Sequence, residues 1–139
     1  KLDCELANHT YNHTILTKVG SQKIISEINK TNSVIKKYTG KEPALVRTPG
    51  GAVNSTVRNT VDYPIIGWSI DTLDWKHRDA NKLVQSVKNQ MHNNAIILMH
   101  DIHQSTADGL NGVLEYLTNE GYEFVNVSAG MSSWTGAIE

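Results

Sequence analysis

Two histidines four positions apart, His9 and His13, are the first residues of the chain whose spacing suggests chemistry. Side chains four residues apart on a helical turn point the same way, so we expect both imidazoles to reach one metal ion. No glutamate follows His9, so this is not the His-Glu-x-x-His pattern of metalloproteases. Two surface or capping histidines are the structural alternative, and the pair alone does not decide between them.

A second group combines an arginine with a glycine-containing turn, in the order Arg47, Thr48, Pro49, Gly50 and Gly51. A planar guanidinium can hold a carboxylate through two parallel N–H groups. Glycines allow the backbone to approach a ligand closely, and the N–H groups of such a turn can bind an anion. The turn is therefore a candidate for handling negative charge. The structural alternative is an ordinary turn with a solvated arginine.

Carboxylates and a third histidine follow two predicted strands further along the chain. Asp71, Asp74 and Trp75 follow one strand, and His100 and Asp101 follow the other. A carboxylate beside a histidine raises the pKa of the histidine and fixes its tautomer, which suits general acid or base catalysis. The indole can line a wall for a sugar. The structural alternatives are capping aspartates, a core tryptophan and a histidine that only ends a strand.

The elements that must position these groups alternate regularly. Short apolar runs predict strands at residues 4–7, 44–46, 64–70, 95–99 and 123–127. Helical spacing of apolar side chains predicts helices at residues 21–38, 54–61, 80–93 and 105–120. This alternation is typical of an α/β fold with a parallel sheet. About five strands are fewer than the roughly eight of a closed barrel, so either the sheet is open or the chain is part of a larger barrel.

The candidate residues stand just after the predicted strands. In parallel α/β folds these strand ends lie on one face, where ligands bind. We therefore expect residues from four places along the chain to converge on one cleft.

Composition limits the classes of function. Hydrophobic residues make up 39% and charged residues 19%, a balance typical of a globular domain. The net charge is −1 and the basic residues are scattered, which argues against nucleic acid as a partner. The longest uninterrupted apolar run, residues 95–99, is far too short to span a membrane. The single cysteine, Cys4, cannot form an internal disulfide.

Taken in order, these groups resemble the motifs of the polysaccharide deacetylase family, the NodB homology domains of carbohydrate esterase family 4. The family blocks read N-H-[ST]-x-x-H, R-x-P, D-x-x-D-W and L-x-H. They match residues 8–13, 47–51, 71–75 and 98–100 in the same order and with agreeing spacing. Each block alone is weak, but the ordered set of four is highly specific.

The resemblance implies a distorted (β/α) barrel and a divalent metal, with zinc as the first expectation and Co²⁺, Ni²⁺ or Mn²⁺ as alternatives. His9 and His13 would be metal ligands, and Arg47 would hold the catalytic base. Pro49 and Gly50 would belong to the oxyanion and substrate-binding part of the site, where the N–H of Gly50 helps the metal bind the oxyanion. Many relatives carry an aromatic residue in place of Gly50, so we expect a more open wall here.

The same resemblance assigns roles to the later blocks. His100 would be the general acid that protonates the leaving amine or alcohol, and Asp74 would tune His100. Trp75 and Leu98 would line the pocket for the acetyl methyl group. The reaction implied is metal-dependent hydrolysis of acetyl groups from a polysaccharide, with N-acetylglucosamine units of peptidoglycan or a chitin-like polymer as the first expectation. From the resemblance to the family, we expect the protein to act outside the membrane, either in the extracellular space or at a bacterial cell surface.

One family block has no counterpart. A T-F-D-D-G-like run supplies a metal-binding aspartate and the catalytic base, and no Asp-Asp pair occurs in this chain. We therefore expect residues 1–130 to be the C-terminal part of a deacetylase domain, residues 131–139 to be a tail, and a missing N-terminal segment to be its partner. The chain alone should be nearly inactive. The alternatives are a non-catalytic carbohydrate-binding relative and a structural β/α domain with incidental histidines.

Overall fold

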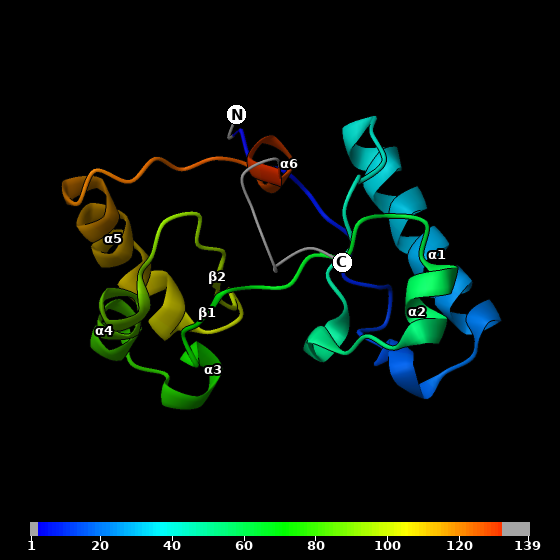
Figure 1. The fold of residues 1–139 in the computed structure, drawn as a ribbon, viewed down its shortest axis with the longest axis horizontal. Helices are drawn as coiled ribbons and strands as arrows, with labels where there is room; N and C mark the ends of the chain where they lie inside the picture. Colours follow the sequence, from blue (N-terminus) through cyan, green and yellow to red (C-terminus); the bar gives the residue numbers. More distant parts are fainter. Residues whose placement is uncertain (1–2, 132–139) are drawn as a thin grey trace. The chain divides into compact units, whose positions relative to one another are not determined.

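The computed structural model describes residues 3–131, which fall into two compact units (Figure 1). The first unit comprises the described residues of 1–67 and 126–139, and the second comprises Trp68–Val125. Each unit contains its own apolar core and one grouping of the candidate residues. Within residues 3–131, no helix has the length and apolar character needed to cross a membrane.

The first unit is built around one long helix. Its helical elements are η1 (Leu16–Lys18), α1 (Ser21–Thr39), η2 (Pro49–Gly51), α2 (Ser55–Thr60) and α6 (Val127–Gly130). Helix α1 ends as predicted at Gly40, which has a left-handed backbone (φ 79°) and donates its N–H to the carbonyl of Lys36. Asn54 caps α2 by accepting the N–H of Val57 at 2.9 Å.

Three extended segments of the first unit pair in parallel. Asn8 pairs with Val46, and Val46 pairs with Ile65. The N–H of Arg47 donates to the carbonyl of Asn8 at 2.8 Å, and the N–H of Ile66 donates to that of Val46 at 2.8 Å. The parallel arrangement predicted from the sequence is present, but each pairing is an isolated bridge, shorter than the predicted strands.

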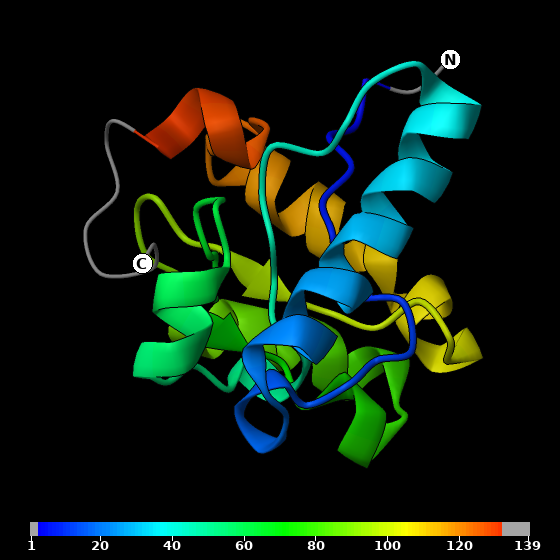
Figure 2. The same ribbon diagram turned by 90° about the vertical axis from the view of Figure 1, so that its right-hand side faces the viewer.

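Apolar side chains from these elements form the core of the first unit. The buried members are Leu16, Ile24, Ile28, Val46, Val57, Val61 and Ile65. They come from η1, one face of α1, α2 with its C-cap, and two of the three bridge segments. The chain that precedes α1 (blue) runs beside that helix in both views, so the core fixes this chain and α1 together (Figures 1 and 2).

The second unit contains a two-stranded parallel sheet and two packed helices. Strands β1 (Ile70–Asp71) and β2 (Ile97–Leu98) pair with Ile70 opposite Ile97. The helices are α3 (Asp74–His77), α4 (Ala80–Gln90) and α5 (Gln104–Asn119). The buried core between α4 and α5 consists of Leu83, Val87, Val113 and Leu117.

A glycine sets the close approach of α4 and α5. A Cβ atom added at Gly109 of α5 would lie 2.9 Å from the carbonyl oxygen of Ala80 and 2.9 Å from Cδ2 of Leu83. The first contact is with backbone, which cannot give way cheaply. Gly109 therefore permits α5 to rest against the start of α4, where the two helices lie side by side (Figure 1).

The predicted last strand, residues 123–127, is wrong. Residues 122–126 have no regular secondary structure, and α6 begins at Val127. The carboxylate of Glu5 accepts both the N–H and the hydroxyl of Ser128, so it satisfies donors at the start of this helical turn. The tail predicted for residues 131–139 lies, apart from Met131, outside the described residues.

Candidate functional site

His9 and His13 lie in the loop that leads to η1, and the expected helical turn is absent there. Thr10 and His13 instead have left-handed backbones, with φ values of 67° and 54°. The two imidazole rings nevertheless contact each other edge to face, with centroids 5.0 Å apart and planes at 68°. The loop geometry, and not a helical repeat, brings the two rings together.

The backbone of the arginine turn orients one of these rings. Nδ1 of His9 lies 2.6 Å from the carbonyl oxygen of Arg47. A carbonyl oxygen only accepts, so Nδ1 carries the proton and the lone pair of the neutral ring is on Nε2. Histidines that bind metals usually have such a partner on the other ring nitrogen.

The two imidazoles fit a divalent transition metal as an incomplete ligand set. Imidazole nitrogen suits zinc, copper, iron and nickel, and the tautomer of His9 presents Nε2 as the donor. Catalytic zinc sites have about three protein ligands. Among residues 3–131, no cluster of three or more histidine, cysteine, aspartate or glutamate side chains is placed to hold a metal ion. The described part of the chain thus offers two ligands.

Two buried side chains anchor the histidine loop to its surroundings. Asn8 donates its side-chain amide to the carbonyl of Ile28 at 2.9 Å and to Oδ1 of Asn32 at 2.6 Å, and its Oδ1 accepts the N–H of Thr10 at 2.8 Å. Glu27 of α1 accepts further N–H groups of the loop. The role of Glu27 could not be recognised from the sequence, because a single glutamate on an amphipathic helix looks like a solvated residue.

The guanidinium group of Arg47 is only partly paired among residues 3–131. Its Nη2 donates to the carbonyl of Gly67 at 3.2 Å. Its Nε is buried and has no hydrogen-bond partner among residues 3–131. Burial lowers the pKa of this guanidinium below its ordinary value. A buried N–H without an acceptor is costly, so the side chain suits a carboxylate ligand.

The turn after Arg47 contains a backbone N–H group, that of Gly50, without an acceptor among residues 3–131. Gly50 and Gly51 both have φ 66°. Gly51 donates its N–H to the carbonyl of Thr48 at 2.9 Å, whereas the N–H of Gly50 makes no hydrogen bond to another residue in the range 3–131. Pro49 is buried and Gly50 is exposed. A Cβ at Gly50 would meet only Ile15, at 3.5 Å, so the left-handed conformation and not a lack of space favours glycine there.

In the second unit, a buried carboxylate holds His100. The Oδ1 atom of Asp74 lies 2.8 Å from Nδ1 of His100, and its Oδ2 accepts the N–H of His100 at 2.5 Å. Asp74 is 4% exposed, whereas the side chain of His100 is 39% exposed. One imidazole edge is thus fixed by the carboxylate while part of the ring remains accessible to a substrate.

Further donors keep Asp74 ionised. Thr106 donates its hydroxyl to Oδ2 at 2.8 Å, and the N–H of Trp75 donates to Oδ1 at 2.9 Å. Burial acts to raise the pKa of Asp74, but the hydrogen bonds from His100 and Thr106 outweigh burial and lower the pKa overall. Thr106 was not predicted as a site residue. The sequence feature that could have indicated it is its position in the first turn of the helix that follows the His100 strand.

The remaining candidates of the second unit have mixed surroundings. The Trp75 side chain is half exposed, and Leu98 is buried on β2. Oδ1 of Asp71 accepts the N–H of Leu73 at 3.0 Å, so Asp71 closes a local turn. Asp101 is exposed. The structure therefore brings together one set of candidates around the histidine pair and a second set around Asp74.

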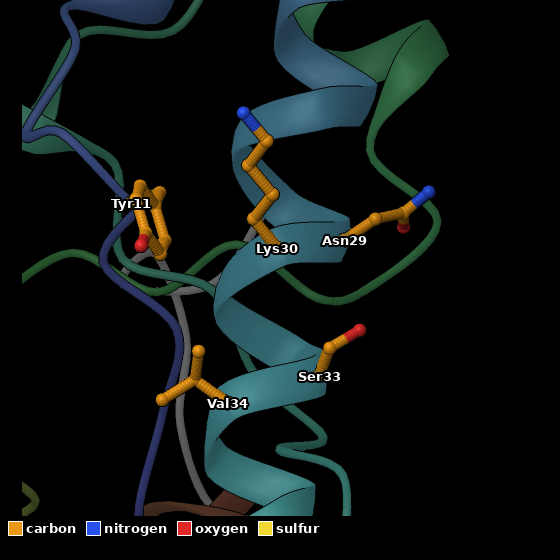
Figure 3. Close-up of a pocket in the computed structure, with 5 residues that line it drawn as sticks. All are labelled: Tyr11, Asn29, Lys30, Ser33 and Val34. Atoms are coloured by element: carbon orange, nitrogen blue, oxygen red, sulfur yellow. The ribbon is translucent and has the colours of Figure 1, made fainter.

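A shallow groove along α1 is distinct from both sets. It is lined by Tyr11, Asn29, Lys30, Ser33 and Val34 (Figure 3). Lys30 and Val34 lie on the side of α1 toward the Tyr11 ring, whereas Asn29 and Ser33 point the other way. The ammonium of Lys30 is 5.7 Å from the centroid of the Tyr11 ring. The groove contains none of the chemically competent groups described above.

Known proteins resemble this chain over most of its length. The sequence profile of the family described as polysaccharide deacetylase matches residues 1–63. The peptidoglycan-N-acetylglucosamine deacetylase PgdA of Listeria monocytogenes is 41% identical over 123 residues, which cover 88% of this chain and 26% of PgdA. The chain spans about a quarter of the length of the curated relatives it matches first.

Solved structures agree with the sequence relatives. A T48 deacetylase with substrate superposes with a TM-score of 0.90 at 32% identity, covering 94% of this chain and 66% of that one. The Xyl-CE4 domain of a multidomain xylanase from the hindgut metagenome of Trinervitermes trinervoides has a TM-score of 0.87 at 32% identity, covering 96% of this chain and 67% of that one. These likenesses confirm the predicted fold class, the distorted (β/α) barrel of the NodB type. The chain belongs to the polysaccharide deacetylase family, the NodB homology domains of carbohydrate esterase family 4.

Proposed function

We propose that this chain is the C-terminal part, residues 1–130, of an enzyme that hydrolyses acetyl groups from a polysaccharide in a metal-dependent reaction. The observation that carries the proposal is the contact between Asp74 and His100, in which a buried carboxylate fixes Nδ1 of a partly exposed imidazole. Relatives named for deacetylation of peptidoglycan N-acetylglucosamine support this polymer, or a chitin-like one, as the substrate.

The residues of the second unit would handle the proton of the leaving group. Asp74 accepts Nδ1–H of His100, so the other ring nitrogen is directed away from the carboxylate. When water attacks the acetyl carbonyl and the C–N bond breaks, a proton carried by that nitrogen passes to the departing amine, leaving acetate and a free amine. Trp75, with its half-exposed indole, would line the sugar pocket beside Leu98.

The residues of the first unit would hold the metal and the developing negative charge. His9 and His13 would bind a divalent ion, with zinc as the first expectation. Such an ion, when bound, polarises the carbonyl and lowers the pKa of water. The N–H of Gly50, which has no acceptor among residues 3–131, would donate to the oxyanion. Arg47, whose buried Nε has no partner in the described part of the chain, would orient the carboxylate base.

The remaining ligand and the base would come from an upstream segment. The chain has no Asp-Asp pair. The buried Nε of Arg47 has no acceptor among residues 3–131, and such a carboxylate would supply one. We therefore propose an aspartate-bearing N-terminal segment of the same protein as a partner in catalysis. By analogy with its peptidoglycan-directed relatives, the enzyme would act outside the cell or at its surface.

Acetate release by the full-length parent protein tests this function. The protein is incubated with peptidoglycan, chitooligosaccharides or acetylxylan, with Zn²⁺ or with a chelator. We expect acetate from at least one polymer, loss of activity with chelator, and nearly no activity from residues 1–139 alone. If the protein binds these polymers but releases no acetate, it is a carbohydrate-binding relative and not an enzyme. If it neither binds the polymers nor releases acetate, the proposal is refuted.

A further inference from the structure

Helix α1 carries a carboxylate that is buried yet belongs to no proposed catalytic step. The side chain of Glu27 is only 1% exposed and faces the histidine loop. A buried carboxylate is costly unless donors surround it, so its partners show what the burial serves.

Three of the partners of Glu27 are in the segment between the two histidines. Oε2 accepts the backbone N–H groups of Tyr11 and Asn12, each at 2.8 Å, and Oε1 accepts the side-chain amide of Asn12 at 2.7 Å. Lys23 contributes the fourth contact, 3.0 Å from Oε1, from one turn earlier on α1. Both carboxylate oxygens are thus used to hold the chain between His9 and His13.

These contacts keep Glu27 ionised. Burial acts to raise the pKa of its carboxyl group, but hydrogen bonds from the side chain and backbone of Asn12 and from Lys23 outweigh burial and lower the pKa to about 2. The loop therefore meets a full negative charge near neutral pH, and hydrogen bonds to an ionised acceptor are roughly twice as strong as neutral ones.

The loop needs support of this kind. Thr10 and His13 both have left-handed backbones, a conformation that residues other than glycine rarely adopt without constraint from their surroundings. Asn8 holds the N–H of Thr10 at the start of the loop, and Glu27 holds the next two backbone N–H groups. Without Glu27, Tyr11 and Asn12 would lose these hydrogen bonds to α1, while Asn8 would still hold the N–H of Thr10.

We propose that Glu27 is a positioning residue that sets the placement of His9 relative to His13 by holding the backbone between them. The inference rests on the proposed function, in which these two histidines bind the metal. Within the described part of the chain, the carboxylate of Glu27 accepts hydrogen bonds from Tyr11 and Asn12 and not from the histidines, so it takes no part in the chemical step. Its role is to fix where two ligands stand before a metal arrives.

The replacement Glu27→Gln tests the charge with little change of shape. The amide oxygen of glutamine can accept the two backbone N–H groups, but its NH₂ group then faces the NH₂ group of Asn12, and two donors cannot pair. Glu42→Gln is the matched control, because Glu42 is exposed and, among residues 3–131, its carboxylate bonds only Lys36. Lys23→Ala is a second control, because it removes the ion pair and leaves the loop bonds of Glu27 intact.

The experiment measures metal binding by the full-length parent protein, prepared metal-free, with Zn²⁺ by calorimetric titration and with Co²⁺ by visible absorption. We expect Glu27→Gln to weaken Zn²⁺ binding about tenfold or more, the size typical of lost support for a metal ligand. The Co²⁺ spectrum at saturation should also change, a readout that general destabilisation does not move. Glu42→Gln and Lys23→Ala should stay within about threefold of wild type.

A metal-free measurement separates this inference from the proposed function. Nuclear Overhauser contacts between the rings of His9 and His13 should be present in the wild type and weakened in Glu27→Gln. If the wild type binds neither metal, the proposed function fails, and the ring contacts still test Glu27. If Glu27→Gln folds with wild-type affinity, Co²⁺ spectrum and ring contacts, the inference is refuted. If Glu27→Gln does not fold, Glu27→Asp, which keeps the charge but withdraws it by one methylene group, is read by the same criteria.

Discussion

The histidine loop of the first unit and the Asp74–His100 pair of the second unit both depend on a buried carboxylate, but in different ways. Asp74 contacts its histidine directly, at both Nδ1 and the backbone N–H. Glu27 holds the backbone between two histidines, and the ring of His9 is oriented by a carbonyl oxygen instead. A direct carboxylate fixes a tautomer and supports a proton carrier, whereas an indirect one fixes only position. That difference agrees with the roles proposed above, a general acid in the second unit and metal ligands in the first.

The largest expected effect tests the direct contact. In the full-length parent protein, His100→Ala should lower kcat for deacetylation by about 10²- to 10⁴-fold, because a general acid contributes that much. Zn²⁺ affinity should not change, since His100 is not among the proposed ligands. The measurement is acetate release. His92→Ala is the control, because His92 is exposed and its ring bonds only its neighbour Asn93 within the described residues. A variant that loses metal binding along with activity would break the comparison.

The next effect concerns the indirect carboxylate and follows pH. The pKa of Glu27 is lowered from 4.5 to about 2, so the stability that its charge provides is complete above pH 4.5 and lost as pH falls through 2. At about 1.4 kcal/mol per pKa unit, this stability is about 3 kcal/mol. The difference in unfolding free energy between the wild type and Glu27→Gln should shrink by about that amount between pH 5 and pH 2. Urea unfolding of the two proteins at each pH measures it, and a constant difference would contradict the prediction.

A smaller effect tests whether helix packing supports the direct contact. Gly109→Ala should destabilise the protein by about 2 kcal/mol, because the added methyl group meets the backbone of Ala80 at 2.9 Å and α5 must move. Thr106 is on the same helix, so its bond to Asp74 should weaken with it. Gly112→Ala is the matched control, since its methyl group meets only a side-chain end of Val84 and alanine favours a helix. Thermal unfolding of both variants separates the two cases, and equal losses would argue against backbone overlap.

The smallest expected effect concerns Thr106 itself. Thr106→Val removes one donor from a buried carboxylate, which should cost about 1 kcal/mol in unfolding free energy. The pKa of Asp74 should rise toward its ordinary value, because a bond that lowers it is lost. NMR titration of the Asp74 carboxyl carbon checks this direction. An unchanged or lower pKa would contradict the contribution of Thr106 to the ionisation of Asp74.

Helix positions were largely predictable because their signals are local. The apolar spacing and Gly40 predicted α1 to within a residue, and helices α4 and α5 were also recognised. The strands were predicted too long, because an apolar run marks burial and does not report how many residues form ladder bonds. The prediction of a strand at residues 123–127 was wrong for a related reason. The helical turn that begins at Val127 is held by contacts of Ser128 with Glu5, which lies near the other end of the chain, and such contacts have no local signature in the sequence.

The sequence by itself determined the family, because four short motifs occur in the family's order and with its spacing. It also indicated which residues are chemically competent, from His9 to His100. Only the tertiary structure identified Glu27 and Thr106, and showed that a left-handed loop brings the histidine rings together. The physical reason is that the segments packed against a helix decide whether its glutamate or threonine holds another residue or is only solvated. Hydrogen bonds between residues far apart in the chain produce no periodic pattern in the sequence.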